Sequence, residues 1–157
     1  MNNKQEIYKI TSIILIIDQF LKLIIKKSLH WNQQIIIIPK FFSLTLVKNT
    51  GAAFSILENN TFLLTIISVI VIIIINNYIK KEKKITKLST ISLGLILGGI
   101  FGNLIDRIIH HGVIDYLSFS FGKYYFPIFN LADIAITIGT ALLFIQIIKE
   151  DTERNKK

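Results

Sequence analysis

Acidic residues inside apolar segments are the feature of this sequence that most suggests chemistry. Four of the five aspartates, Asp18, Asp106, Asp115 and Asp133, lie in or beside long apolar stretches, whereas the glutamates lie in polar links or near the chain ends. An ionisable group at bilayer depth costs about 2.5–3.5 kcal/mol even on insertion-based scales, so each one needs a partner or a function. These four aspartates therefore define the candidate site.

Two of these aspartates have polar partners at helical spacing. Lys22 follows Asp18 by four residues, and Asn103 lies three residues before Asp106 and four before Arg107. Residues three or four apart share one face of a helix. We therefore interpret Asp18, Lys22 and Asp106 mainly as structural charges that hold helices together.

The other two aspartates, Asp115 and Asp133, have no obvious cation nearby in the sequence. Asp133 lies three residues after Asn130 in a predicted first helical turn, so a simple capping role is open to it. Two carboxyl groups that share a site do not both ionise easily, and one stays protonated near neutral pH. Such a pair supplies a base that activates water and an acid that protonates a leaving group, with neither metal nor cysteine.

The elements that must position these residues are long apolar segments. Of the 157 residues, 52% are hydrophobic, and about 20 mostly apolar residues suffice to span a bilayer. We therefore predict a mainly α-helical integral membrane protein, organised as a single membrane domain over residues 1–157. Its predicted spans are residues 8–25, 61–79, 88–109 and 130–148.

The first segment also has the length of a signal peptide, but charged residues interrupt it and no small-residue cleavage site follows, which favours a permanent helix. The chain contains no cysteine, which excludes disulfides, thiolate metal sites and a cysteine nucleophile.

The positions of the basic residues predict the orientation. The net charge is +8, and lysines crowd the short link 80–87 and the tail after residue 148. Short basic loops stay cytoplasmic, so we expect both termini in the cytoplasm and the links 26–60 and 110–129 outside. Charges that flank membrane spans in this way do not indicate nucleic-acid binding.

The first outer link has the pattern of a small sheet. Residues 35–38 are a β-branched run that ends at Pro39, and residues 42–46 alternate between apolar and polar types. We therefore predict a small extracytoplasmic β-sheet within residues 28–60, between the first and second helices. Its apolar strands, over residues 41–54, would clamp a substrate from above.

Small residues indicate close packing of the third and fourth spans, which would bring Asp115 and Asp133 together. These residues are Gly94, Gly98 and Gly102 in the third span, and Ala132, Ala135 and Gly139 in the fourth.

Five short segments follow one another in a familiar order. With these segments the chain resembles the lipoprotein signal peptidases, the type II signal peptidases of bacteria, over its whole length from the first span to the fourth. The segments are DQFLK (18–22), NTGAAFS (49–55), GGIFGNLIDR (98–107), GVIDY (112–116) and FNLAD (129–133).

The resemblance implies an aspartyl endopeptidase of the bacterial cytoplasmic membrane. Such an enzyme removes the signal peptide of diacylglyceryl-modified prolipoproteins, just before the lipidated cysteine, as a monomer in membrane lipid and without a cofactor or metal. The catalytic aspartates of the family fall on Asp115 and Asp133, toward the outer leaflet. Positions that hold the site or the substrate fall on Asn49, Asn103, Arg107 and Asn130, and further supporting positions on Asp18, Lys22 and Asp106.

Two other classes of function stay open. Intramembrane acids also form ion pathways, but the second span has few polar residues and the acids of the third and fourth spans gather toward one side. A non-enzymatic scaffold would explain Asp18 and Asp106, but it leaves Asp115 and Asp133 without a role.

Overall fold

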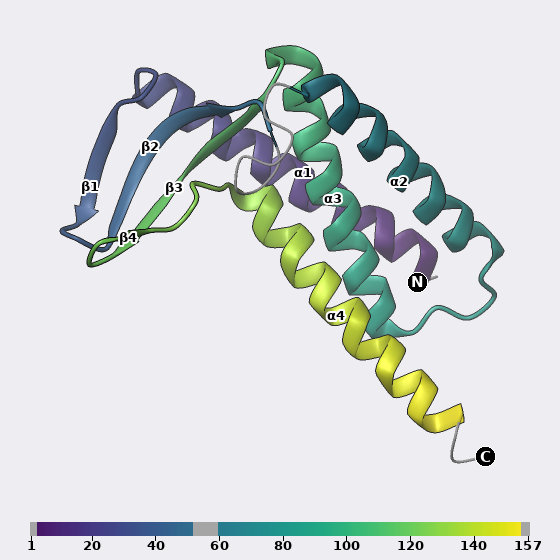
Figure 1. Cartoon of the computed structure of the whole chain (residues 1–157). Coiled ribbons are helices and arrows are strands. Elements are labelled where there is room, and N and C mark those ends of the chain that lie inside the picture. The colour runs from purple at the N-terminus through teal and green to yellow at the C-terminus, as the bar shows by residue number, and fades with distance from the viewer. Residues whose placement is uncertain (1–2, 52–59, 155–157) are drawn as a thin grey trace.

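The computed structural model describes residues 3–51 and 60–154, which form four helices and four strands (Figure 1). The last four residues of the NTGAAFS segment, and with them the end of the proposed clamp, lie outside the described residues. The helices are α1 (Asn3–Ser28), α2 (Thr61–Lys81), α3 (Lys87–His110) and α4 (Leu131–Arg154). The strands are β1 (Gln34–Ile38), β2 (Phe42–Asn49), β3 (Val113–Phe121) and β4 (Tyr124–Tyr125).

Three helices of the described chain are long and apolar enough to cross a membrane, namely α2, α3 and the part of α4 over Leu131–Thr152. Helix α1 has 26 residues, which is about 39 Å at 1.5 Å per residue. Its apolar sequence is interrupted by charged residues such as Asp18 and Lys22. A fourth span formed by α1 therefore stays a prediction.

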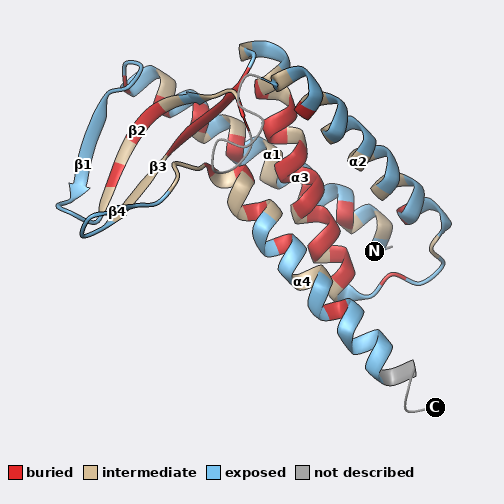
Figure 2. Cartoon of the chain, viewed as in Figure 1, coloured by how far each residue is buried: buried red, intermediate tan, exposed pale blue. Residues whose placement is uncertain are grey.

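Helix α3 is the centre of the helical bundle. It packs against α1, α2 and α4, and Figure 2 shows buried residues along most of its length. In the apolar 18-residue stretch of each helix, 67% of the α3 residues are buried, against 17% in α2 and 22% in α4. Apolar helices that the protein itself does not cover need an apolar solvent, so α2 and α4 have lipid-facing surfaces.

Glycines set the distance between α3 and α1. A Cβ atom placed on Gly94 would lie 2.7 Å from the Cβ of Ile10, and one on Gly98 would lie 2.7 Å from the Cβ of Ile14. The series Gly94, Gly98 was expected to face the fourth span. It faces α1 instead, because α3 is enclosed on two sides and uses a different glycine face for each neighbour.

The close contact between α3 and α4 depends on a second set of glycines. A Cβ on Gly99 would collide with the backbone carbonyl of Ala132, at the start of α4. Further along, a Cβ on Gly139 of α4 would lie 2.8 Å from the backbone oxygen of Ser92 in α3. The predicted close approach of the third and fourth spans is therefore present. It depends on Gly139, as predicted, and on Gly99, which was not predicted.

The strands form one antiparallel sheet in the order β1-β2-β3-β4, at the end of the bundle where α1 and α3 end and α4 begins (Figure 1). The predicted strand pair of the first link is present as β1 and β2. The expectation that the sheet lies wholly between the first and second helices is wrong, because β3 and β4 come from the link after α3. The first four residues of β3 are all buried, so the alternating pattern that reveals a half-exposed strand is missing there.

A left-handed residue connects α3 to the sheet. His111 has a φ of 53° and donates its backbone N–H to the carbonyl of Arg107, which closes the last turn of the helix. The chain then enters β3, where Asp115 pairs with Val47 and Val113 pairs with Asn49 of β2. This register brings Asn49 and Asp115 onto neighbouring strands.

We expect Gly99→Ala to destabilise the protein, because the added methyl group meets the α4 backbone, which cannot move without displacing the first turn of that helix. Overpacking of this kind costs about 1–3 kcal/mol, and thermal unfolding in detergent would measure it. The control is Ile109→Ala on the same helix, where the side chain is 61% exposed. Equal melting temperatures of the two variants would contradict the assignment of Gly99.

Candidate active site

Asn130 connects the two aspartates to which the sequence assigned catalysis. Its side-chain amide donates to Asp115 Oδ1 at 2.7 Å, and its backbone N–H donates to Asp133 Oδ2 at 3.1 Å. Asp115 comes from β3 and Asp133 from the first turn of α4, so one asparagine contacts both carboxyl groups across the junction of sheet and helices. Asn130 is fully buried, which fixes this bridge in one position.

Asp133 is indeed a helix-capping residue, but capping uses only part of its carboxyl group. The backbone N–H of Asp133 donates to Asn130 Oδ1 at 3.0 Å, which completes a reciprocal capping box with the contact to Oδ2. Its other oxygen, Oδ1, accepts from the side-chain amide of Asn103 at 2.7 Å. The capping role therefore orients the carboxyl group without accounting for all of its contacts.

Asn49 supports Asp115 from the neighbouring strand. Its side-chain amide donates to Asp115 Oδ2 at 2.9 Å, while its oxygen accepts from the backbone N–H of Gly51 at 2.9 Å. The second contact decides which end of the amide faces the acid. Each of the two carboxyl groups is thus held by amide donors on both oxygens.

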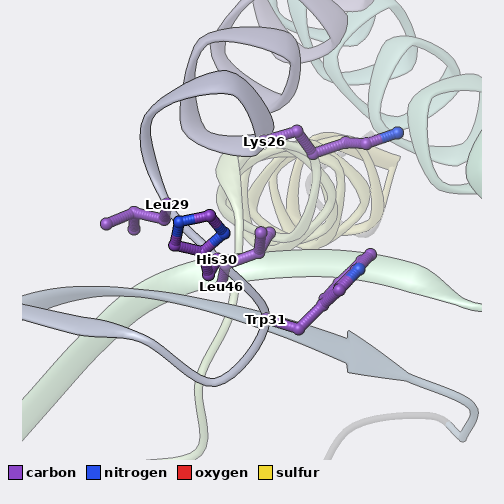
Figure 3. Close-up of a pocket in the computed structure, with 5 residues that line it drawn as sticks. All are labelled: Lys26, Leu29, His30, Trp31 and Leu46. Carbon is purple, nitrogen blue, oxygen red and sulfur yellow. The ribbon is translucent and has the colours of Figure 1, made fainter.

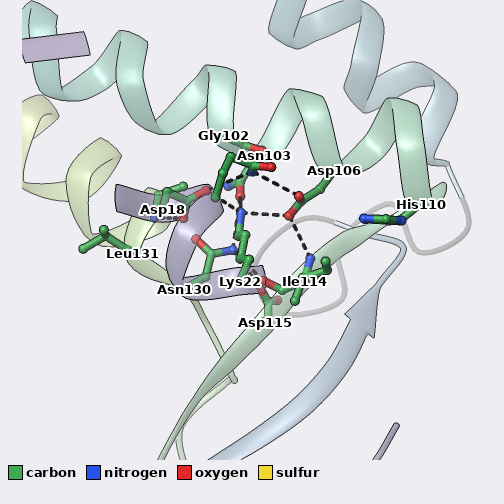
Figure 4. Close-up of polar contacts among 12 residues, drawn as sticks. Asp18, Lys22, Gly102, Asn103, Asp106, His110, Ile114, Asp115, Asn130 and Leu131 are labelled. Carbon is green, nitrogen blue, oxygen red and sulfur yellow. Dashed lines mark hydrogen bonds and ion pairs between the residues drawn. The ribbon is translucent and has the colours of Figure 1, made fainter. Parts of the chain in front are cut away.

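A buried cation, Lys22, lies within electrostatic range of Asp115 (Figure 4). The Lys22 ammonium nitrogen lies 2.8 Å from Asp18 Oδ2, 2.8 Å from Asp106 Oδ2 and 3.1 Å from Asn103 Oδ1. Three acceptors match its three N–H donors. The predicted pair of Asp18 with Lys22 is present, and Lys22 also pairs with Asp106, for which the sequence suggested partners only on its own helix.

The two carboxylates that hold Lys22 also hold the backbone next to the candidate acids. Asp18 Oδ1 accepts from the N–H of Ala132 at 3.0 Å, and Asp106 Oδ2 accepts from the N–H of Ile114 at 3.1 Å. Ala132 directly precedes Asp133, and Ile114 directly precedes Asp115. The ion cluster therefore positions both acids through their neighbouring peptide groups.

Gln19, for which the sequence predicts no role, lies in the ion cluster. Its amide donates to Gly102 O at 3.1 Å, Asp106 Oδ1 at 3.2 Å and Asp18 Oδ2 at 3.3 Å, and so connects α1 with α3. A polar amide within an apolar segment and next to Asp18 is a signal that could have identified it.

Tyr116 belongs to the GVIDY segment, and the sequence predicts no separate role for it. Its hydroxyl oxygen accepts from the backbone N–H of Leu131 at 3.3 Å, at the start of α4. A buried tyrosine in an apolar strand looks like an ordinary core residue in the sequence, so no local signal could have shown this contact.

Arg107, which the family resemblance places among the residues that hold the site or the substrate, is a second cation near the two acids. It lies on α3 within electrostatic range of both acids, and its electrostatic interaction with Asp133 is stronger than that with Asp115. The structure thus brings together all the site residues predicted from the sequence. Asn130 bridges Asp115 and Asp133. The residues around them are Asn49, Asn103, Arg107, Asp18, Lys22 and Asp106.

Burial shapes the chemistry of Asp115. Burial, with a further contribution from the negative charge of Asp133, raises the pKa of Asp115 from 3.8 to about 7, against the opposing effect of hydrogen bonds from Asn49 and Asn130. A large share of Asp115 is therefore protonated at neutral pH. The arrangement can offer a proton donor and a proton acceptor within one site.

Fold and site together define a membrane protein with a buried and a partly buried aspartate bridged where its helices meet its sheet. A family model described as Signal peptidase (SPase) II matches residues 10–149. The chain belongs to the signal peptidase II family, and its family is one of proteases.

Relatives match along almost the whole chain. The lipoprotein signal peptidase of Listeria monocytogenes serotype 4a (strain HCC23) is 42% identical over 92% of this chain and 94% of its own length. The lipoprotein signal peptidase of Clostridium tetani (strain Massachusetts / E88) is 41% identical over 91% of this chain and 92% of its own length. A solved bacterial membrane enzyme at 31% identity superposes with a TM-score of 0.85, covering 94% of this chain and 90% of that one. A second solved bacterial membrane enzyme, at 32% identity, superposes with a TM-score of 0.79 and covers 89% of this chain and 90% of its own.

We expect Asn49→Ala to raise the pKa of Asp115 further, because the hydrogen bond from Asn49 stabilises the ionised carboxylate and the variant removes it. Hydrogen bonds to charged groups contribute about 1.5–3 kcal/mol, and one pKa unit is about 1.4 kcal/mol, so a rise of about one to two units is expected. Infrared titration would follow the protonated carboxyl band of Asp115, which is present at low pH and lost as the pH rises through the pKa.

The band is identified by its absence in Asp115→Asn. In Asn49→Ala it should persist to higher pH, whereas Asn76→Ala, which removes an amide near the far end of α2, should leave its midpoint unchanged. A midpoint that does not move in Asn49→Ala would show that this hydrogen bond does not control the titration.

Proposed function

We propose that this protein is an intramembrane aspartyl endopeptidase that removes the signal peptide of diacylglyceryl-modified prolipoproteins and cuts before the lipidated cysteine. Its family and its lipoprotein signal peptidase relatives support the substrate class. The observation that carries the catalytic assignment is the bridge of Asn130 between Asp115 and Asp133. A bridge that holds two carboxyl groups in one site suits acid–base hydrolysis without a metal, in which one carboxyl group keeps a proton and the other is ionised.

In the proposed reaction Asp115 is the acid and Asp133 is the base. Asp115 keeps its proton because its pKa is raised to about 7, while Asp133 takes a proton from water. The water oxygen bonds to the scissile carbonyl carbon, and the carbon–nitrogen bond then breaks as Asp115 gives its proton to the leaving nitrogen. Asp133 ends protonated and Asp115 ionised, and proton exchange restores the resting pair.

The amides of the site would keep both acids in place during this exchange. Asn103 and Asn130 donate to Asp133, and Asn49 and Asn130 donate to Asp115. We propose that Arg107 and Asn103 also hold the substrate backbone. Asp18 and Asp106 act as positioning residues, because they accept from the peptide groups before each acid and do not contact the acids themselves. Lys22 positions the acids indirectly, because it pairs with both of these carboxylates.

The proposed membrane topology places the site near the outer leaflet. In it, α1 is the fourth span, both termini lie in the cytoplasm, and the sheet lies outside, where its strands would cover the substrate. The signal peptide is itself an apolar helix, so it and the acyl chains stay in lipid while the scissile bond reaches the acids. The enzyme acts as a monomer and needs no cofactor.

We expect Asp115→Asn and Asp133→Asn each to lower the rate of prolipoprotein cleavage by about 10²–10⁴-fold, because each removes one partner of the acid–base pair. Purified protein and a diacylglyceryl-modified prolipoprotein would measure this. The double variant should be little worse than either single one, since the two acids act as a unit. Asp151→Asn, in the exposed end of α4, is the matched control and should cleave normally.

A near-normal rate in one folded variant would remove that aspartate from catalysis and make Asp106 the next candidate. Absence of cleavage by folded wild-type protein would reject the peptidase and favour an ion pathway or a scaffold.

The topology can be tested with single cysteines, because the chain has none of its own. We expect Lys123→Cys, between β3 and β4, to react with a membrane-impermeant maleimide added to intact cells. Lys83→Cys, between α2 and α3, should react only after the membrane is opened, because short basic loops stay cytoplasmic. Both side chains are exposed, so a reversed labelling pattern would mean a reversed topology.

A further inference from the structure

A small pocket at the C-terminal end of α1 has no part in the site described above. Lys26, Leu29, His30, Trp31 and Leu46 line it (Figure 3). Its volume is about 180 Å³, below the roughly 300–1,000 Å³ of pockets that enclose drug-sized ligands. It therefore suits a small chemical group, such as a phosphate, rather than a whole organic ligand.

Lys26 supplies the charge of this pocket. Its ammonium nitrogen lies 3.1 Å from His110 Nε2, and because an ammonium group only donates, His110 accepts at that nitrogen. Two N–H donors of Lys26 are left beyond this contact. Lys48 is a further cation within electrostatic range of His110. Asp106 also lies within electrostatic range of His110, but its carboxylate pairs with Lys22.

The residues that line the pocket include no acid, so its field favours an anion. The other lining residues combine an apolar floor with further N–H donors. Leu29 and Leu46 are buried, whereas Trp31 is 52% exposed at the rim and His30 is exposed beside it. A tryptophan with an apolar ring and one N–H is typical of the interface between membrane and water. The pocket thus joins a cation and N–H donors, which suit a phosphate group, to a floor of two leucines.

We propose that this pocket binds the phosphate headgroup of an anionic phospholipid from the outer leaflet. The bound lipid would hold the end of α1 at the membrane surface, one helical turn beyond the buried Lys22. The proposal goes beyond cleavage and rests on the proposed topology, which places this end of α1 at the outer headgroups.

Native mass spectrometry of the purified protein would test the lipid, with phosphatidylglycerol and phosphatidylcholine of identical acyl chains as probes. We expect wild-type protein to retain phosphatidylglycerol preferentially. Lys26→Gln should lower that retention about fivefold, the effect of one charge near an anionic lipid. His30→Leu should also lower it, because it removes the ring N–H donor, and it serves as the second variant because it leaves the contact of Lys26 with His110 intact. Lys27→Gln, an exposed neighbour outside the pocket, should change nothing.

Equal retention of the two lipids by wild-type protein would overturn the proposal, and so would equal losses in the Lys26 and Lys27 variants. Displacement of the lipid by inorganic phosphate alone would assign the pocket to the free anion and reject the phospholipid. Lipid retention is measured without a prolipoprotein, so this proposal and the proposed peptidase activity fail independently of each other.

Discussion

The buried ammonium group of Lys22 is the interaction on which both the helix packing and the site depend. It joins α1 to α3 through Asp106, and Asp18 beside it reaches the first turn of α4. Removing one partner of a buried ion pair costs about 3–5 kcal/mol, because the charge that remains is left uncompensated. Here the loss would also release the peptide groups before Asp115 and Asp133, so stability and site geometry are maintained by the same contacts.

This cluster can form only because the helices approach closely at its level. A Cβ on Gly102 would collide with the carboxylate of Asp18, so the glycine provides the space that this group occupies. Gly99 similarly lets α3 touch the carbonyl of Ala132, where the capped end of α4 begins. Packing and polar contacts therefore cannot be varied separately in this part of the molecule, since each glycine faces an atom that belongs to the site or to its support.

The sequence predicted those features that depend on local spacing. The long apolar helices, the pair of Asp18 with Lys22 and the capping position of Asp133 all follow from residues a few positions apart. The pairing of Lys22 with Asp106 and the assignment of glycine faces to α1 or α4 depend on which helices become neighbours, which no single segment encodes. Strand β3 was not predicted, because its first half is buried on both faces and lacks the alternation of apolar and polar residues that marks a half-exposed strand. The catalytic assignment came from resemblance to a family as well as from spacing, and it stays a prediction.

The distribution of charge explains why the proton of the site should rest on Asp115 in particular. Four carboxyl groups meet two cations there, so a fully ionised site would carry excess negative charge in a buried environment. Asp18 and Asp106 contact the Lys22 ammonium directly, and Asp133 has the stronger interaction with Arg107. Asp115 is buried and its direct partners are neutral amides, which stabilise negative charge less than a cation does. Protonation of Asp115 therefore removes the least compensated charge, and in the proposed reaction the cations that stabilise the fold would also determine which acid serves as the proton donor.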